Sequence, residues 1–247
     1  MENQFTDFLS KTNPETLIIY GLVNEPARVL AELDQHKGSI VFLTNRYALL
    51  ASNINALRLS SSGWINITFE QRGTLACPRD LFLFCRRKIL GRVSQFAKPI
   101  RQFLDAYLDF VWNQMEIFKD ELEECLLNPE VYGPQDWVFS AFLPLPNAFI
   151  LLPSEFERGS PQFAEVDIIF WLNGRIKAVV IEGMGTPIKS RQRRLDYLCE
   201  NHPYLDLISV SRDGISNGRF PTDAFSVPFN HYWRGLTLPM GPAPPII

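Results

Sequence analysis

The strongest local signal in the sequence is the dipeptide Asn173-Gly174, which stands between two short apolar runs. The first run is AEVDIIFWL at 164–172, and the second is RIKAVVIEG at 175–183. Asn-Gly is strongly favoured in two-residue hairpin turns, because both of its residues tolerate a positive φ. The segment therefore predicts two antiparallel strands joined by a two-residue turn.

Each apolar run carries an acidic side chain, Asp167 in the first and Glu182 in the second. An ionised carboxylate inside a strand is costly unless it is paired with a base or binds a metal ion. Antiparallel pairing brings the two acids close together, and neighbouring carboxylates repel unless a proton or a cation lies between them. Hard oxygen ligands of this kind suit Mg²⁺ or Mn²⁺. Glu165 falls on the same strand face as Asp167 and is either a third ligand or a solvent-facing acid.

The elements around the hairpin follow a simple order. Apolar residues recur at helical spacing from Phe103 to Cys125, which predicts a long amphipathic helix after Pro99 with its aromatic stripe packed in the core. One or two strands are expected around 144–147, a helix at 186–203 after the hairpin, and a strand at 204–211. The second half therefore reads helix, strand, two hairpin strands, helix, strand.

The first 95 residues show a different pattern. Strand-like runs are expected at 16–23, 39–44 and 64–69, with one helix signature at 24–38 and a further short apolar run at 79–90. The sequence predicts an α+β protein with a strand-rich N-terminal α+β unit over 1–95. Residues 96–247 are expected to form an α/β core with an irregular C-terminal tail.

Composition limits the classes of function. A formal net charge of −3 and a pI near 5.7 argue against a generally basic nucleic-acid binder, so phosphate contact needs a local patch such as KSRQRR at 189–194. The four cysteines form no CxxC pair, and reduced thiols are expected. We see no signal peptide and no apolar run of about 20 residues, so a soluble cytoplasmic protein without a membrane partner is expected. A nucleophile elbow and a phosphate-binding glycine loop are also lacking.

The hairpin with its two acids, in this order of elements, resembles the PD-(D/E)XK nuclease superfamily over about residues 103–211. EVDIIF with Asp167 is similar to the first motif, and VVIEGM with Glu182 is similar to the second. The resemblance implies a restriction-endonuclease-like core of helix, three strands, helix and strand. It implies a nuclease that hydrolyses phosphodiester bonds in nucleic acid, with DNA favoured over RNA. It also implies Mg²⁺ or Mn²⁺ held by Asp167, Glu182 and Glu165, and it allows a homodimer.

The chain departs from the family at the motif lysine, because Met184 stands two residues after Glu182. Methionine can neither activate a water molecule nor stabilise charge on a phosphate. By resemblance to branches in which the basic residue moves to the next helix, Lys189 is the replacement. The phosphate contacts would be Arg191, Arg193 and Arg194.

Other interpretations stay open at this point. The site could bind metal but cleave poorly, or the chain could be a catalytically inactive nuclease-fold protein that binds nucleic acid or a protein partner. Asp167 and Glu182 could also be structural acids paired with basic residues on the hairpin or the following helix, namely Arg175, Lys177 or Arg194. The family's helix glutamate has four candidates, which are Glu116, Glu121, Glu123 and Glu124.

Overall fold

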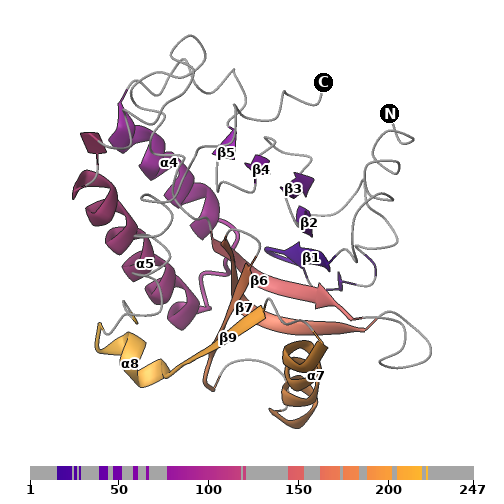
Figure 1. The fold of residues 1–247 in the computed structure, drawn as a ribbon. Coiled ribbons are helices and arrows are strands. Elements are labelled where there is room, and N and C mark those ends of the chain that lie inside the picture. Colours follow the sequence, from indigo (N-terminus) through magenta and orange to yellow (C-terminus); the bar gives the residue numbers. More distant parts are fainter. Residues whose placement is uncertain are drawn as a thin grey trace, which may run out of the picture.

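The structure of the protein is a computed structural model of the 247-residue chain (Figure 1). It describes residues 16–23, 25–26, 28, 39–43, 47–51, 58–60, 65–66, 77–117, 119–120, 144–152, 162–172, 175–183, 188–201, 205–218 and 221.

A single nine-stranded sheet runs through the described part of the chain, in the order β5-β4-β3-β2-β1-β6-β7-β8-β9. Every neighbouring pair is antiparallel except β8 and β9, which are parallel. The strands are β1 (Thr16–Tyr20), β2 (Ser39–Leu43), β3 (Tyr47–Ala51), β4 (Arg58–Ser60), β5 (Ile65–Asn66), β6 (Pro144–Leu151), β7 (Phe163–Leu172), β8 (Arg175–Ile181) and β9 (Leu205–Val210).

Helices cover both faces of the sheet. They are α4 (Pro78–Leu90), α5 (Lys98–Ile117), α7 (Ile188–Asn201) and α8 (Arg212–Ser216). Figure 1 shows α4 and α5 together on one side of β6 and β7, and α7 on the other side. Helix α7 connects β8 to β9, because two parallel strands need a crossover between them. None of the helices among the described residues is long and apolar enough to cross a membrane.

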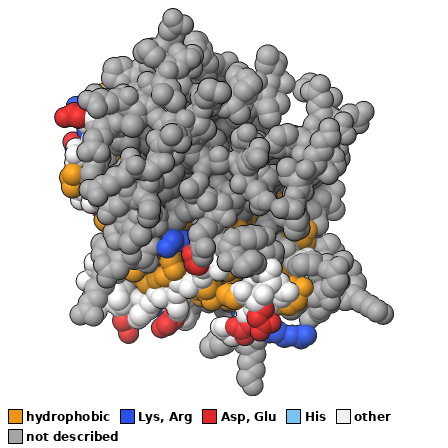
Figure 2. Space-filling model, in the orientation of Figure 1, with side chains coloured by type: hydrophobic (Ala, Val, Ile, Leu, Met, Phe, Trp, Pro, Cys, Tyr) orange, Lys and Arg blue, Asp and Glu red, His pale blue; other side chains and the backbone are white. Residues whose placement is uncertain are grey.

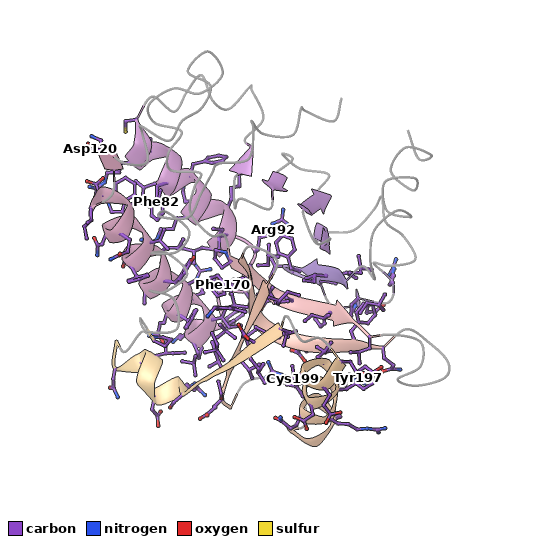
Figure 3. All side chains as sticks on the ribbon, in the orientation of Figure 1. Phe82, Arg92, Asp120, Phe170, Tyr197 and Cys199 are labelled. Carbon is purple, nitrogen blue, oxygen red and sulfur yellow. The ribbon has the colours of Figure 1, made fainter. Side chains whose placement is uncertain are left out.

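The main core lies between α5 and the sheet. Phe170 of β7 lies between the sheet and α5 (Figure 3). The rings of Phe103 and Tyr107 of α5 pack against it, with centroid distances of 6.5 and 4.7 Å. Helix α4 joins this core through Phe82, whose ring lies 4.9 Å from that of Trp112 on α5. The aromatic stripe predicted for the long helix therefore packs in the core, as expected.

The element order predicted for the second half is confirmed. The hairpin register ends with Leu172 opposite Arg175, which leaves two residues for the connection. The long helix begins at Lys98 and therefore contains Pro99 in its first turn, where a missing backbone N–H breaks no helical bond. The mixed α+β class is also confirmed.

The N-terminal region contributes five strands to the same sheet, because β1 pairs with β6. The apolar run at 79–90 forms most of α4, whose apolar side chains pack against α5. Most of the helix expected at 24–38, and the tail beyond 221, fall outside the described residues. The division of the chain near residue 95 stays a prediction.

Candidate functional site

Asp167 lies where the pairing of β7 and β8 stops. The last paired residues at this end of the hairpin are Ile168 and Val179. Beyond them the Oδ2 atom of Asp167 accepts the backbone N–H of Ile181 at 2.6 Å, so a carboxylate replaces a backbone carbonyl as acceptor. The Asp167 side chain therefore lies at the end of the backbone pairing between β7 and β8, and its bond to Ile181 holds it in place.

The same Oδ2 atom also accepts a hydrogen bond from Arg191 of α7, at an Nη2–Oδ2 distance of 2.9 Å. The side chains of Asp167 and Arg191 are each only 6% exposed. Arg191 lies four residues before Leu195 and seven before Leu198, both buried, so it shares the apolar face of α7. Its Nε atom additionally donates to the backbone carbonyl of Glu165 at 3.3 Å. The buried guanidinium thus ties α7 to β7 at two points.

The pKa of Asp167 is raised above its ordinary value, chiefly because burial disfavours the ionised carboxylate. The charge of Arg191 and the hydrogen bonds from Ile181 and Arg191 act in the opposite direction, and the nearby charge of Glu165 adds to the rise. The neighbouring arginine therefore offsets only part of the cost of burial.

Glu182 follows the last residue of β8, and β9 positions it. Its backbone N–H donates to the carbonyl of Val210 at 3.0 Å, which extends the parallel pairing by one residue. Its exposed carboxylate accepts a hydrogen bond from the Ser209 hydroxyl, with an Oγ–Oε1 distance of 3.1 Å. Gly183 comes next with a φ of +80°, a backbone conformation that glycine adopts without strain. Strand β8 is therefore followed by a turn at Glu182 and Gly183.

The strand on the other side of β7 is also irregular at the level of Asp167. The register passes from Pro146–Ile168 to Ala148–Val166, so Asn147 of β6 lies opposite Asp167. Asn147 has a φ of 49°, and its Nδ2 atom donates to the backbone carbonyl of Arg92 at 3.0 Å. Strained backbone of this kind clusters at functional sites. The irregular residue of β6 therefore lies beside Asp167 in the sheet.

The three arginines of α7 do not share one surface. Arg191 faces the sheet, and Arg194 is half-buried and bonds to the Phe163 carbonyl at 3.2 Å and to Gln162 Oε1 at 2.9 Å. Arg193 is exposed. Figure 2 shows acidic and basic side chains next to each other over α7. The side chain of Lys189 and all of Met184 lie outside the described part of the chain.

Asp167 and Glu182 both lie at the end of the β7–β8 pairing, where the Asp167 carboxylate bonds to the residue before Glu182. The Glu182 carboxylate bonds to Ser209 of β9, and Glu165 is half-buried two residues before Asp167. No group of three or more histidine, cysteine, aspartate or glutamate side chains could hold a metal ion within the residues described. Glu116 is exposed on α5, and the other three helix glutamates are outside the described ranges. The site is thus a pair of acids with a buried arginine beside one of them.

The arginine partner was missed in the sequence, where Arg175, Lys177 and Arg194 were considered as partners of the acids. The available signal was the spacing of Arg191, Leu195 and Leu198, which puts an arginine on the buried face of a helix. No protein-family model, no curated protein and no solved structure matches this chain.

Proposed function

We propose that the chain is a metal-dependent phosphodiesterase of the PD-(D/E)XK type, with a restriction-endonuclease-like core acting on nucleic acid. The order of α5, β6, β7, β8, α7 and β9 agrees with the core that this superfamily is expected to have. The observation that carries the proposal is the hydrogen bond of Asp167 to the Ile181 N–H, one residue before Glu182. This contact supports the proposal that the two acids act together at the end of the β7–β8 pairing.

The available donors fit a hard divalent cation. Mg²⁺ is commonly held by one or two carboxylates together with water and substrate phosphate oxygens, so two acids are sufficient. Both contacts of Asp167 within the described part of the chain use Oδ2, which leaves Oδ1 for a further ligand. Glu182 offers an exposed carboxylate. When bound, the ion would lower the pKa of a water molecule and neutralise charge on the phosphate.

The residues around the acids hold the two carboxylates in fixed orientations and do not themselves react. Arg191 and the Ile181 N–H fix the rotation of the Asp167 carboxylate, and Ser209 fixes that of Glu182. Lys189, in the first turn of α7, is the proposed replacement for the lysine missing at Met184. Among the three arginines of α7, Arg193 is the exposed one, and it is the proposed phosphate contact on this helix.

The buried ion pair favours a second candidate function. Arg191 already supplies a positive charge to Asp167, which reduces the electrostatic demand for a metal ion at this carboxylate. A chain that retains the fold but has lost cleavage would bind nucleic acid or a protein partner without cutting a bond. The two candidates differ in one measurable property, metal-dependent hydrolysis.

A cleavage assay tests the proposal. Single-stranded, duplex and branched DNA and RNA are incubated with the protein in Mg²⁺, Mn²⁺ or EDTA. We expect cleavage that requires metal and falls at least about 100-fold in Glu182→Gln, since loss of one preorganised charged contact costs that order in rate. Glu182 is exposed, so this variant should keep the fold. A matched control is Glu116→Gln, an exposed acid on α5.

Metal binding is tested separately by thermal unfolding. Mn²⁺ at 100 times its dissociation constant should stabilise the wild type by about 2.7 kcal/mol, because it binds only the folded state. Glu182→Gln should lose most of this gain, and Glu116→Gln should keep it. Absence of both cleavage and metal stabilisation would reject the enzyme and favour the non-catalytic candidate.

A further inference from the structure

The connection between α4 and α5 carries a concentration of positive charge that the acid pair does not use. Residues 86–101 contain six basic side chains and no acidic one, in a chain with a formal net charge of −3. Arg86 is ion-paired with Asp105 at 2.6 Å and with Asp109 at 2.5 Å. Arg87, Phe96 and Arg101 line one pocket with Leu22, and Arg92 lies over the ring of Tyr20, two residues before Leu22. We call Arg87, Arg92, Phe96 and Arg101 the α4–α5 face; Lys88 and Lys98 are its neighbours in the sequence.

Hydrogen bonds fix the shape of this face. The Nη1 atom of Arg101 donates to the carbonyls of Leu90 and Val93, at 3.0 and 3.2 Å, and so closes the turn after α4 while keeping its charge. Asn147 of β6 bonds to the carbonyl of Arg92, and the Arg92 guanidinium lies 5.3 Å from the Tyr20 ring centroid. Figure 3 shows Arg92 between the end of α4 and β1. The face is therefore attached to the sheet.

An aromatic side chain and an apolar pocket accompany the charge. Phe96 is 82% exposed, although a phenyl ring is usually buried. Beside it lies a pocket of about 560 Å³, lined by Leu22, Leu90 and Val93 together with Arg87 and Arg101. Leu22, just after β1, is itself 46% exposed. Exposed apolar surface bordered by charge is typical of a binding surface.

We propose that the α4–α5 face binds single-stranded nucleic acid, with Phe96 stacking on a base and the basic side chains contacting phosphates. Proteins that bind single strands combine a positive groove with aromatic side chains, because unpaired bases expose their π-faces. A duplex offers no free base to Phe96. The inference rests on the proposed function for the identity of the ligand, and it assigns the surface that holds the strand.

Fluorescence anisotropy with a labelled oligothymidylate of about 20 nucleotides tests the face. The experiment uses the full chain in EDTA, so that cleavage cannot interfere. The variants are Phe96→Ala and Arg87→Gln, both at exposed positions. The matched control is Arg79→Gln, which removes the same charge from the other end of α4, about 12 Å along the helix from Arg87.

We expect Phe96→Ala to weaken binding about 5- to 100-fold, the range for loss of one stacking platform. Arg87→Gln should weaken binding and reduce the slope of log K against log salt by about 0.7, since one fewer phosphate is neutralised. Arg79→Gln should change affinity less than about 2-fold. Phe96 and Arg87 lie outside the acid pair, so the effects of these two variants on binding in EDTA report on the face.

Three results would overturn the inference. They are no binding by the wild type at low salt, equal affinities for wild type, Phe96→Ala and Arg87→Gln, and Phe96-dependent binding to anionic phospholipid vesicles without binding to the oligonucleotide. Binding without cleavage would keep the face and reject the proposed enzyme. Cleavage with unchanged affinity in both variants would keep the enzyme and reject the face.

Discussion

The carboxylate of Asp167 has to satisfy two different demands. Burial at 5% exposure makes its charge costly, and the contacts from Arg191 and Ile181 reduce that cost without removing it. A carboxylate held in this way has a fixed orientation, which favours metal binding, but it also has a counter-charge already. Variants of the Arg191–Asp167 pair can measure whether Arg191 mainly compensates the buried charge of Asp167 or mainly orients its carboxylate.

Arg191→Met tests the pair as a structural element. We expect the free energy of unfolding at neutral pH to fall by about 3–5 kcal/mol, because Asp167 would remain buried without its counter-charge. Urea unfolding measures this loss. Adding Asp167→Asn to Arg191→Met should recover a large part of it, since the uncompensated carboxylate is then gone. A loss below about 1 kcal/mol in the single variant would mean that water or another base compensates Asp167.

The raised pKa of Asp167 predicts a pH dependence. The folded-state pKa lies above the ordinary value of 3.8, so the folded protein binds the proton more tightly than the unfolded chain does. The contribution of this group to stability therefore falls as the pH rises from about 4 towards the folded-state pKa. Asp167→Asn does not titrate, so its stability relative to the wild type should increase from about pH 4 to pH 7 in EDTA.

Urea titrations of both proteins at several pH values measure this difference. The opposite trend, with Asp167→Asn losing stability relative to the wild type as the pH rises, would mean that attraction to Arg191 exceeds the cost of burial. Glu165→Gln serves as a comparison, because its charge contributes to the shift of Asp167. That variant should make the pH dependence weaker.

At the scale of elements, the sequence predicted those parts that local chemistry determines. Asn173-Gly174 fixed the hairpin, and the spacing of Phe103, Tyr107 and Val111 fixed the buried face of α5. The run at 79–90 was not assigned, because short apolar runs do not distinguish a strand from a buried helix. Residues 81–84 are four consecutive apolar residues, so they show neither the alternation of a strand nor the spacing of an amphipathic helix. Phe82 packs against Trp112 of α5, and this contact favours the helix.

The irregular residue of β6 gives a prediction at this scale. Asn147→Val should destabilise the protein by about 2 kcal/mol, because a β-branched residue is strained at a positive φ and the bond to Arg92 is lost. Asn147→Gly should cost less, about 1 kcal/mol, since glycine accepts the backbone conformation and loses only the side-chain bond. Thermal and urea unfolding compare the two. Equal losses would assign the whole effect to the hydrogen bond.

At the scale of the molecule, the pairing of β1 with β6 could not be read from the sequence. It joins residues near 19 to residues near 149, and hydrophobic periodicity carries no information on partners so far apart. The ion pair of Asp167 with Arg191 was missed for a related reason, because it depends on how α7 rotates against the sheet. The positions of Asp167 in the first hairpin strand and of Glu182 at the end of the second were predicted correctly, since they depend only on the distance from the turn.

The continuous sheet predicts that the N-terminal strands stabilise the region around the acid pair. Ile18 of β1 is fully buried in the cluster that contains Phe170 of β7. Ile18→Ala should therefore lower the free energy of unfolding by about 3 kcal/mol, the usual cost of such a cavity. Amide hydrogen exchange should show the same loss of protection in β7 and α5 as in β1, because the strands open together.

Leu83→Ala is the matched control, because Leu83 is 40% exposed on α4 and its truncation removes less buried surface than that of the fully buried Ile18. We expect it to change protection in β7 by less than about 0.5 kcal/mol. If Ile18→Ala instead lowered protection in β1 alone and left β7 unchanged, the strands before residue 95 would open independently of the rest. The predicted division of the chain near residue 95 would then describe two units of separate stability, although their strands share one hydrogen-bonded sheet.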